Sequence, residues 1–150
     1  MSYIRYKNNN LFVEGVSVRK LTSKFSTPFY LYSESNIIEN YRSFSSNFKK
    51  SNPLICFSVK ANSNIQILKV LKKMGSGADV VSGGELLKAI KSGIKPNKIV
   101  FSGVGKTEDE IKFFFERPNL SSAFPVEIFL CVGALISGFS LTPMAVFLFN

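Results

Sequence analysis

A unit of strand, capped helix and glycine is repeated through the middle of the chain. Apolar strands are predicted at residues 54–59, 78–81 and 98–102. A capping side chain and a helical pattern follow each strand, and the first two helices are expected to end at Gly75 and Gly93. Repeats of this kind predict βαβ units, which wind right-handed into a parallel sheet with the helices outside. The fold class is therefore α/β.

The residues before the repeat predict a small β region and one helix. Residues 10–22 alternate loosely and predict one or two short strands around Gly15, and residues 27–33 predict another strand. Ser33 or Ser35 is then expected to cap a helix through residues 36–48. An N-terminal β segment is therefore expected ahead of the repeated units.

Charge and composition argue against several classes of function. The net charge is +9, but the lysines are dispersed over predicted helix faces without interleaved aromatic residues, which does not favour a nucleic-acid surface. The chain contains no histidine, so zinc sites and Ser–His–Asp chemistry are poorly supported. Two cysteines and the lack of an export signal favour a cytoplasmic location.

The first repeated strand ends on Lys60, which Ala-Asn-Ser-Asn follows. Because side chains alternate along a strand, Lys60 is expected to share a face with Ser58, Cys56 and Leu54, at the carboxyl end of the sheet where α/β barrels bind ligands. A partly desolvated lysine loses its proton more easily and can attack an aldehyde to form a Schiff base. From these residues alone, a lysine that simply reaches water at the end of a strand is the preferred interpretation.

A resemblance to a known family changes that preference. The segment "FSVKANSN" resembles the cofactor-lysine motif of the fold-type III pyridoxal-phosphate decarboxylases, which act on ornithine, arginine and diaminopimelate. "TPFYLYSESNIIENYRSF", "GADVVSGGELLKAI" and "KIVFSGVGKTEDEI" extend the resemblance over roughly residues 8–116. The segments "VSGGE" and "FSGVGKT" are most similar to those of the family members that act on diaminopimelate.

This resemblance implies a fold, a cofactor and a reaction. The fold would be the first three βα units of a (β/α)8 barrel, preceded by a short β segment. The cofactor would be pyridoxal 5'-phosphate, and the full-length family is expected to form homodimers. The reaction would be decarboxylation of meso-diaminopimelate to L-lysine, a step of lysine biosynthesis.

The resemblance also implies roles for three residues. Lys60 corresponds to the lysine that holds the cofactor covalently. Asp79 and Glu85 match acidic positions near that lysine, where they could neutralise its ammonium group. For Asp79, a strand-end carboxylate paired with a nearby lysine is an equally good alternative. For Glu85 the alternative is stronger, because Ser82 and Glu85 have the spacing of a helix capping box.

The resemblance stops near Arg117, and no histidine is present to stack on the cofactor ring. We therefore expect three regions: 1–32, 33–116 and an apolar tail at 117–150 outside the pattern. The tail would arise from a frameshift, a gene disruption or an artificial junction. Such a chain would be truncated and inactive, with an unpaired sheet edge that promotes association. Three alternatives remain: a remnant without biochemical role, another fold-type III protein such as an ornithine or arginine decarboxylase or a racemase, and a membrane protein spanning through residues 128–149.

Overall fold

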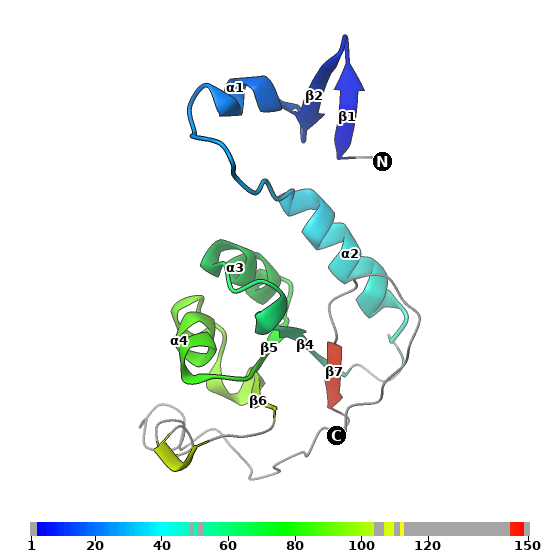
Figure 1. Ribbon diagram of the computed structural model, residues 1–150. Coiled ribbons are helices and arrows are strands. Elements are labelled where there is room, and N and C mark those ends of the chain that lie inside the picture. The colour runs from blue at the N-terminus through cyan, green and yellow to red at the C-terminus, as the bar shows by residue number, and fades with distance from the viewer. Residues whose placement is uncertain are drawn as a thin grey trace. The chain divides into compact units, whose positions relative to one another are not determined.

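Two separate β-sheets organise the chain (Figure 1). The structure is a computed structural model that describes residues 3–48, 50, 53–103, 107–109, 112 and 145–148. The chain divides into two units, Met1–Ser46 and Asn47–Asn150. Each unit contains one of the sheets, and each is described below by itself.

The first unit is a three-stranded antiparallel sheet with two helices. Its elements are β1 (Ile4–Lys7), β2 (Asn10–Val13), β3 (Val16–Ser17), α1 (Val18–Thr22) and α2 (Glu34–Ser46). The strands pair in the order β1-β2-β3. The predicted strands around Gly15 are confirmed, because β2 and β3 form a hairpin that turns through Glu14 and Gly15, both with positive φ. The helix predicted through 36–48 is also confirmed.

Three details of this unit differ from the prediction. The strand predicted at 27–33 is wrong, since these residues form no strand. Pro28 has no amide hydrogen to donate to a sheet, and Tyr30 is 89% exposed, so no partner strand or core holds the segment extended. Residues 18–22 form α1 rather than the end of a strand, and β1 was not predicted.

Glu14 connects the hairpin turn to the start of α2. Its carboxylate accepts hydrogen bonds from the hydroxyl of Ser33 and from the amide of Ser35, at 2.5 and 2.6 Å. Ser33 Oγ in turn accepts from the amide of Asn36, at 3.0 Å, so Ser33 caps the helix. These hydrogen bonds favour the carboxylate and lower the pKa of Glu14 below its ordinary value.

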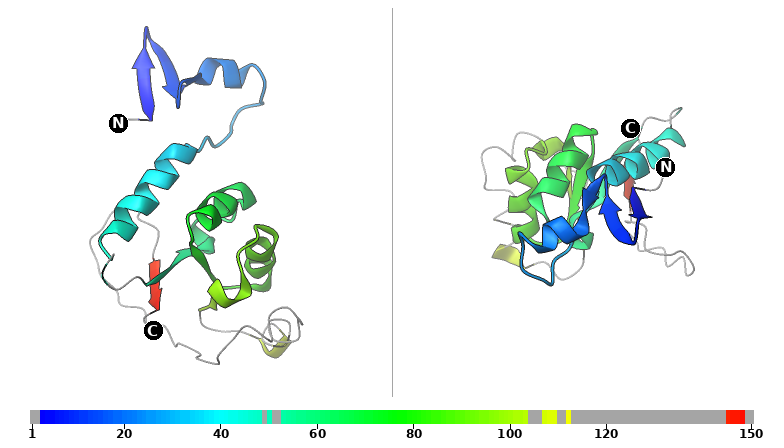
Figure 2. Two further views of the ribbon diagram at one scale, coloured as in Figure 1. Left: turned by 180° about the vertical axis from the view of Figure 1, so that it is seen from behind. Right: turned by 90° about the horizontal axis from the view of Figure 1, so that it is seen from above.

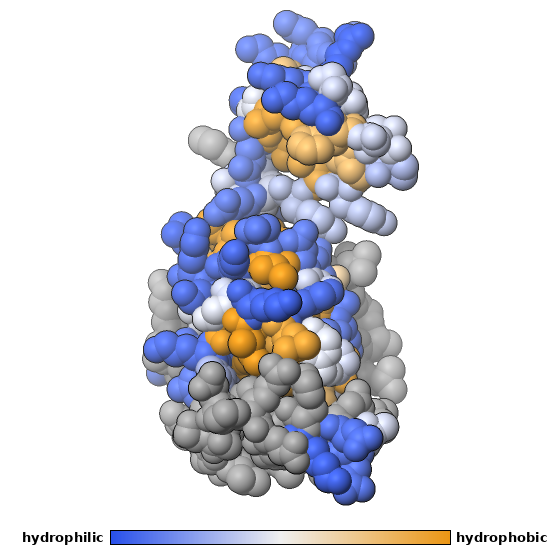
Figure 3. Space-filling view, turned by 90° about the vertical axis from the view of Figure 1, so that its left-hand side faces the viewer, coloured by the Kyte–Doolittle hydropathy of each residue, from blue (hydrophilic) through white to orange (hydrophobic). Residues whose placement is uncertain are grey.

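Large apolar side chains remain at the surface of the first unit. None of its described residues is buried, and Figure 3 shows apolar side chains on the visible face near the top of the view. All the large hydrophobic side chains that are exposed in the described part of the chain belong to this unit: Ile4, Tyr6, Val16, Phe25, Tyr30, Leu31, Tyr32 and Phe44. The first unit therefore lacks the buried core that the second unit has.

The second unit contains the repeated strands and helices. Its elements are β4 (Leu54–Ser58), the 3-10 turn η1 (Val59–Ala61), α3 (Ile65–Lys73), β5 (Gly77–Val80), α4 (Gly83–Lys91), the 3-10 turn η2 (Pro96–Lys98), β6 (Ile99–Phe101) and β7 (Ala145–Leu148). β4 pairs with β5 and β5 pairs with β6, both in parallel. The predicted parallel βα pattern is confirmed. Of the third predicted helix, Glu108, Asp109 and Lys112 are helical, and its other residues lie outside those described.

The core of this unit forms where α3 and α4 pack against the sheet. The two helices lie side by side along it (Figures 1 and 2). Their apolar faces bury Leu68 and Leu86, which meet Val59 from η1 and Val80 from β5. Burying side chains of this size stabilises a fold by about 1.5–3 kcal/mol each. Gly75 and Gly93 follow the helices with positive φ, as predicted for helix stops.

The outer edge of β4 is occupied by β7. The two strands pair antiparallel, with Leu54 opposite Leu148 and Phe57 opposite Ala145. β7 therefore covers the β4 edge, and β6 is the other strand at an end of the sheet order, so the expected unpaired edge stays a prediction. β7 is the part of the predicted tail that the structure describes, and the rest of residues 117–150 lies outside the described residues. No helix in the described ranges is long and apolar enough to cross a membrane.

At Gly77 the backbone of β5 packs tightly against the neighbouring chain segments on both sides. A Cβ atom added there would lie 2.3 Å from the carbonyl oxygen of Lys98 and 2.7 Å from the Sγ atom of Cys56. The oxygen belongs to the backbone, so it cannot move aside without disturbing the start of β6. Only glycine fits between these two neighbours.

We predict that Gly77→Ala destabilises the second unit. Forcing a methyl group into a filled core costs about 1–3 kcal/mol. The measurement is urea unfolding followed by circular dichroism. Gly84→Ala is the control, because the nearest atom to its Cβ is 4.0 Å away. An equal loss of stability in both variants would contradict the close approach at Gly77.

We also predict that the contact between the hairpin turn and α2 depends on pH through Glu14. Because the pKa of Glu14 is lowered on folding, its contribution is complete above the unfolded pKa and disappears as pH falls through the folded pKa. The protection of the Ser35 amide from exchange, expressed relative to an unstructured chain at the same pH, should therefore fall in acid. Glu14→Gln should remove that dependence. A Ser35 protection factor that stays the same in acid in the unsubstituted chain would refute the role of Glu14.

Candidate functional site

The carboxyl ends of β4, β5 and β6 bring three polar side chains together. Ser58 ends β4 and lies opposite Asp79 in β5. Asp79 lies opposite Val100, and Ser102 follows two residues later, on the same face of the extended chain. The amide of Ser102 donates to the carbonyl of Val80 at 3.0 Å, so the pairing continues to this residue. Parallel pairing thus aligns residues that are far apart in the sequence.

Hydroxyl groups hold the Asp79 carboxylate from both sides. Ser58 Oγ donates to Oδ2 of Asp79 at 3.3 Å, and Ser102 Oγ donates to Oδ1. Asp79 is only 6% exposed and Ser58 only 1%. Among the described residues, no lysine or arginine forms an ion pair with Asp79. The structure therefore places a buried carboxylate at the strand ends, with two hydroxyl partners and with no cationic partner in the described part of the chain.

Lys60 lies immediately beyond the end of β4. The strand ends at Ser58, and Lys60 belongs to η1, which lies beside β5. The predicted strand face shared by Lys60, Ser58 and Cys56 is therefore wrong at Lys60, because strand alternation does not extend into a 3-10 turn. The Lys60 side chain is exposed, whereas Val59 beside it is fully buried. The lysine is thus carried on a turn anchored in the core.

The three polar residues after Ala61 fix the loop that follows Lys60. Asn62 Oδ1 accepts from the amide of Asn64 at 3.0 Å, and Asn64 Oδ1 accepts from the amide of Gln66 at 2.9 Å. Asn64 is therefore the N-cap of α3. Ser63 Oγ accepts from Lys88 Nζ at 2.7 Å, which ties the loop to α4. The polar sequence after the lysine is explained by these contacts.

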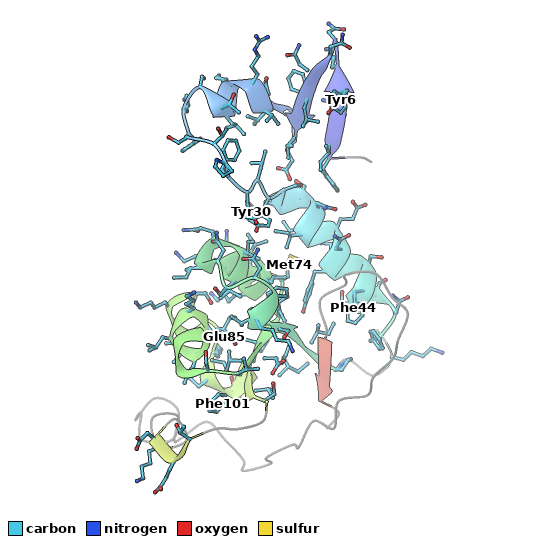
Figure 4. All side chains as sticks on the ribbon, in the orientation of Figure 1. Tyr6, Tyr30, Phe44, Met74, Glu85 and Phe101 are labelled. Atoms are coloured by element: carbon cyan, nitrogen blue, oxygen red, sulfur yellow. The ribbon has the colours of Figure 1, made fainter. Side chains whose placement is uncertain are left out.

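Glu85 lies at the start of α4 (Figure 4) and caps that helix. Its carboxylate accepts from the amide of Val81 at 2.9 Å, and its own amide donates to Ser82 Oγ at 3.3 Å. The predicted capping contacts of Ser82 and Glu85 are present, with Val81 rather than Ser82 as the amide that Glu85 satisfies. The structure shows a helix-capping role for Glu85, and a catalytic role for it stays a prediction.

Cys56 lies beneath the polar cluster in β4. Burial raises the pKa of its thiol to about 12, and the negative charge of Asp79 adds to this effect. Its Sγ atom is 3.9 Å from the carbonyl oxygen of Lys98. A thiol in this protonated state is a poor nucleophile, so Cys56 serves packing rather than chemistry.

The residue that sequence reasoning missed is Ser102. Ser102 lies beside Asp79 because of the register of β6 against β5, which the sequence does not reveal.

A separate groove of about 620 Å³ lies in the first unit. It is lined by Tyr3, Ser35, Ile38, Glu39, Arg42 and Ser43. None of the strand-end residues contributes to that groove.

The residues at the strand ends fit the lysine-bearing part of a site for an aldehyde cofactor. An exposed amine can condense with an aldehyde, and a buried carboxylate nearby can accept from its ammonium form. Within the described residues, no group of histidine, cysteine and acidic side chains has the arrangement of a metal site. The chemistry of the donor set is therefore that of an amine and a carboxylate.

Comparison with known proteins identifies the relatives of this arrangement. Residues 34–118 match the family described as pyridoxal-dependent decarboxylase, pyridoxal binding domain. Diaminopimelate decarboxylase from Aquifex aeolicus is 48% identical over 109 residues, which are 73% of this chain and 26% of that protein. The Helicobacter pylori enzyme is 50% identical over 93 residues, covering 62% of this chain and 23% of that protein.

A solved structure shows the same relation in three dimensions. Diaminopimelate decarboxylase from M. jannaschii, crystallised with L-lysine, superposes with a TM-score of 0.69 at 37% identity. The match covers 77% of this chain and 28% of that chain. The chain thus spans about a quarter of the length of the relatives that it matches.

We predict that Asn64→Ala destabilises the second unit by about 1 kcal/mol, because α3 loses its cap. Asn64→Ser keeps a side-chain acceptor and should remain close to the unsubstituted chain. Urea unfolding measures both variants. Equal stability of the alanine and serine variants would show that the Asn64 side chain does not support the loop after Lys60.

Proposed function

Because this chain belongs to the family of pyridoxal-dependent decarboxylases, we propose that it provides the lysine-bearing part of the cofactor site of a diaminopimelate decarboxylase. The reaction is the conversion of meso-diaminopimelate to L-lysine and CO2. The observation that carries the proposal is Lys60 in its anchored turn, beside the strand that holds the buried Asp79. Identities of 42–50% to diaminopimelate decarboxylases favour this substrate over ornithine or arginine.

Lys60 would hold pyridoxal 5'-phosphate covalently through its Nζ atom. When bound, this cofactor accepts the electron pair that remains on the α-carbon as the bond to CO2 breaks, and a proton then takes the place of CO2. The protein's own residues keep Lys60 on a fixed turn and keep a carboxylate at the strand ends. Asp79 would stabilise the ammonium form of Lys60 after a substrate amine has replaced it. Glu85 contributes through the cap of α4 and is the weaker candidate for direct participation.

Turnover by these 150 residues alone is not expected. The chain has no histidine to stack on the cofactor ring, a role that the family resemblance assigns to that residue type. The described site provides an amine and a carboxylate, which are sufficient to capture an aldehyde but not to orient an amino-acid substrate. Cofactor capture and decarboxylation should therefore be separable. The boundaries 32/33 and 116/117, dimerisation and a cytoplasmic location remain predictions.

We predict that Lys60 is the amine modified by pyridoxal 5'-phosphate. The folded chain is incubated with the cofactor, reduced with borohydride, digested and analysed by mass spectrometry. Because Lys60 is held beside the strand ends, its adduct should form in preference to adducts on the dispersed surface lysines. Lys60→Arg should lose this adduct while it keeps the positive charge, and Lys69→Arg on α3 is the matched control.

The same preparation decides between the proposal and its alternatives. Release of CO2 from meso-diaminopimelate is measured in parallel and is expected to be absent. An adduct spread evenly over all lysines, unchanged by Lys60→Arg, would exclude the proposed cofactor site and favour a remnant without biochemical role. Decarboxylation of ornithine or arginine, with none of diaminopimelate, would overturn the substrate assignment.

A further inference from the structure

The Asp79 carboxylate is held in a way that ordinary packing does not require. A carboxylate has two oxygens with about four acceptor sites. Here each oxygen receives one hydroxyl, from Ser58 on one neighbouring strand and from Ser102 beyond the other. The two contacts together fix the plane of the carboxylate, and the described residues leave its other acceptor sites unused.

The Asp79 carboxylate is buried, so its remaining acceptor sites require a donor to compensate the charge. A buried carboxylate is costly unless hydrogen bonds or a cation compensate its charge. The two hydroxyls supply part of the compensation, and no described cation is paired with Asp79. η1, which carries Lys60, lies beside β5, and Lys60 is two residues from Ser58. An ammonium group arriving at the strand ends can therefore supply the remaining donors.

We propose that Ser58 and Ser102 are positioning residues, whose hydroxyls hold the Asp79 carboxylate in place as an acceptor for the Lys60 ammonium group. This inference rests on the proposed function, because it concerns the same lysine. Ser58 and Ser102 touch neither cofactor nor substrate in this role and act through Asp79. The strand ends thereby form a preset ammonium subsite, built from one residue on each of three neighbouring chain segments.

The consequence for chemistry follows from charge. A lysine must be neutral to add to an aldehyde, and a fixed carboxylate nearby favours the charged form. Asp79 therefore competes with the aldehyde for the Lys60 side chain, because an ammonium group held by the carboxylate has no free electron pair with which to attack. Loss of either hydroxyl frees the carboxylate to turn away and weakens this effect.

The test measures the yield of the Lys60 adduct with pyridoxal 5'-phosphate over a series of pH values, by borohydride reduction and mass spectrometry. At pH values below the midpoint of the curve of adduct yield against pH, Asp79→Asn should raise the yield by about threefold to tenfold. The substitution should also move that midpoint to lower pH. Ser58→Ala and Ser102→Ala should each move it in the same direction by a smaller amount. Ser102→Thr keeps a hydroxyl at a half-buried position and should restore the original profile.

A second comparison separates positioning from general loss of structure. In the Asp79→Asn background, the serine substitutions should have no further effect, because the group through which they act is gone. Urea unfolding confirms that each variant is folded, and serine to alanine removes one oxygen without adding bulk. The other titratable groups on the elements around β5 are unchanged throughout: Cys56, Glu85, Lys88, Lys91 and Lys98.

Each outcome decides between the proposals. If the unsubstituted chain forms no Lys60 adduct, the proposed function fails and the positioning role fails with it. If the adduct forms but both serine variants keep the original pH profile, only the positioning role is overturned. It is equally overturned if the serine variants shift the profile as strongly in the Asp79→Asn background as in the unsubstituted chain.

Discussion

Parallel pairing of β4, β5 and β6 is the constraint on which the candidate site depends. It aligns the carboxyl ends of three strands, so that Ser58, Asp79 and Ser102 meet although the sequence separates them widely. The pairing is held by the apolar faces of α3 and α4, whose buried leucines pack against the same sheet. The stability of the core and the geometry of the site are therefore set by the same contacts, and a change of register would disperse the polar cluster.

The sequence could predict the order of elements but not the details that complete the site. The repeated strands, the cap of α4 at Ser82 and the glycine stops follow from local patterns, and each is found in the second unit. The cap of α3 is Asn64, whereas the sequence pattern indicated Asn62 or Ser63. The strand predicted at 27–33 failed because aromatic residues favour strands only where a partner and a packed face exist. Ser102 could not be recognised as part of the site, because its contact with Asp79 depends on the register between two strands. That register is limited by the close approach at Gly77, which no single-strand pattern reveals.

Folding and function make different demands on the polar residues near Lys60. Asn62, Asn64 and Glu85 satisfy backbone amides, so their conformations are fixed by helix capping. Asp79 accepts from no backbone amide of the described residues and lies buried between two hydroxyls. A buried carboxylate that caps no helix and has no cationic partner among the described residues is the stronger indication of chemistry, since its burial costs free energy that two hydroxyl groups recover only in part. This difference separates Asp79 from Glu85 more clearly than sequence spacing could.

The antiparallel pairing of β7 bears on how this sheet can be extended. A strand edge offers one set of amide and carbonyl groups, so β4 can pair with only one partner on that side. In a closed (β/α)8 barrel every strand has parallel neighbours on both sides, including the strand equivalent to β4. β7 and such a parallel neighbour are therefore mutually exclusive at this edge. The Lys60 turn follows β4 directly, so whichever strand occupies the edge also forms one wall beside the lysine. A structure with β7 at this edge thus has the parallel strands, the polar cluster and the lysine turn, but a different wall from that of the closed barrel.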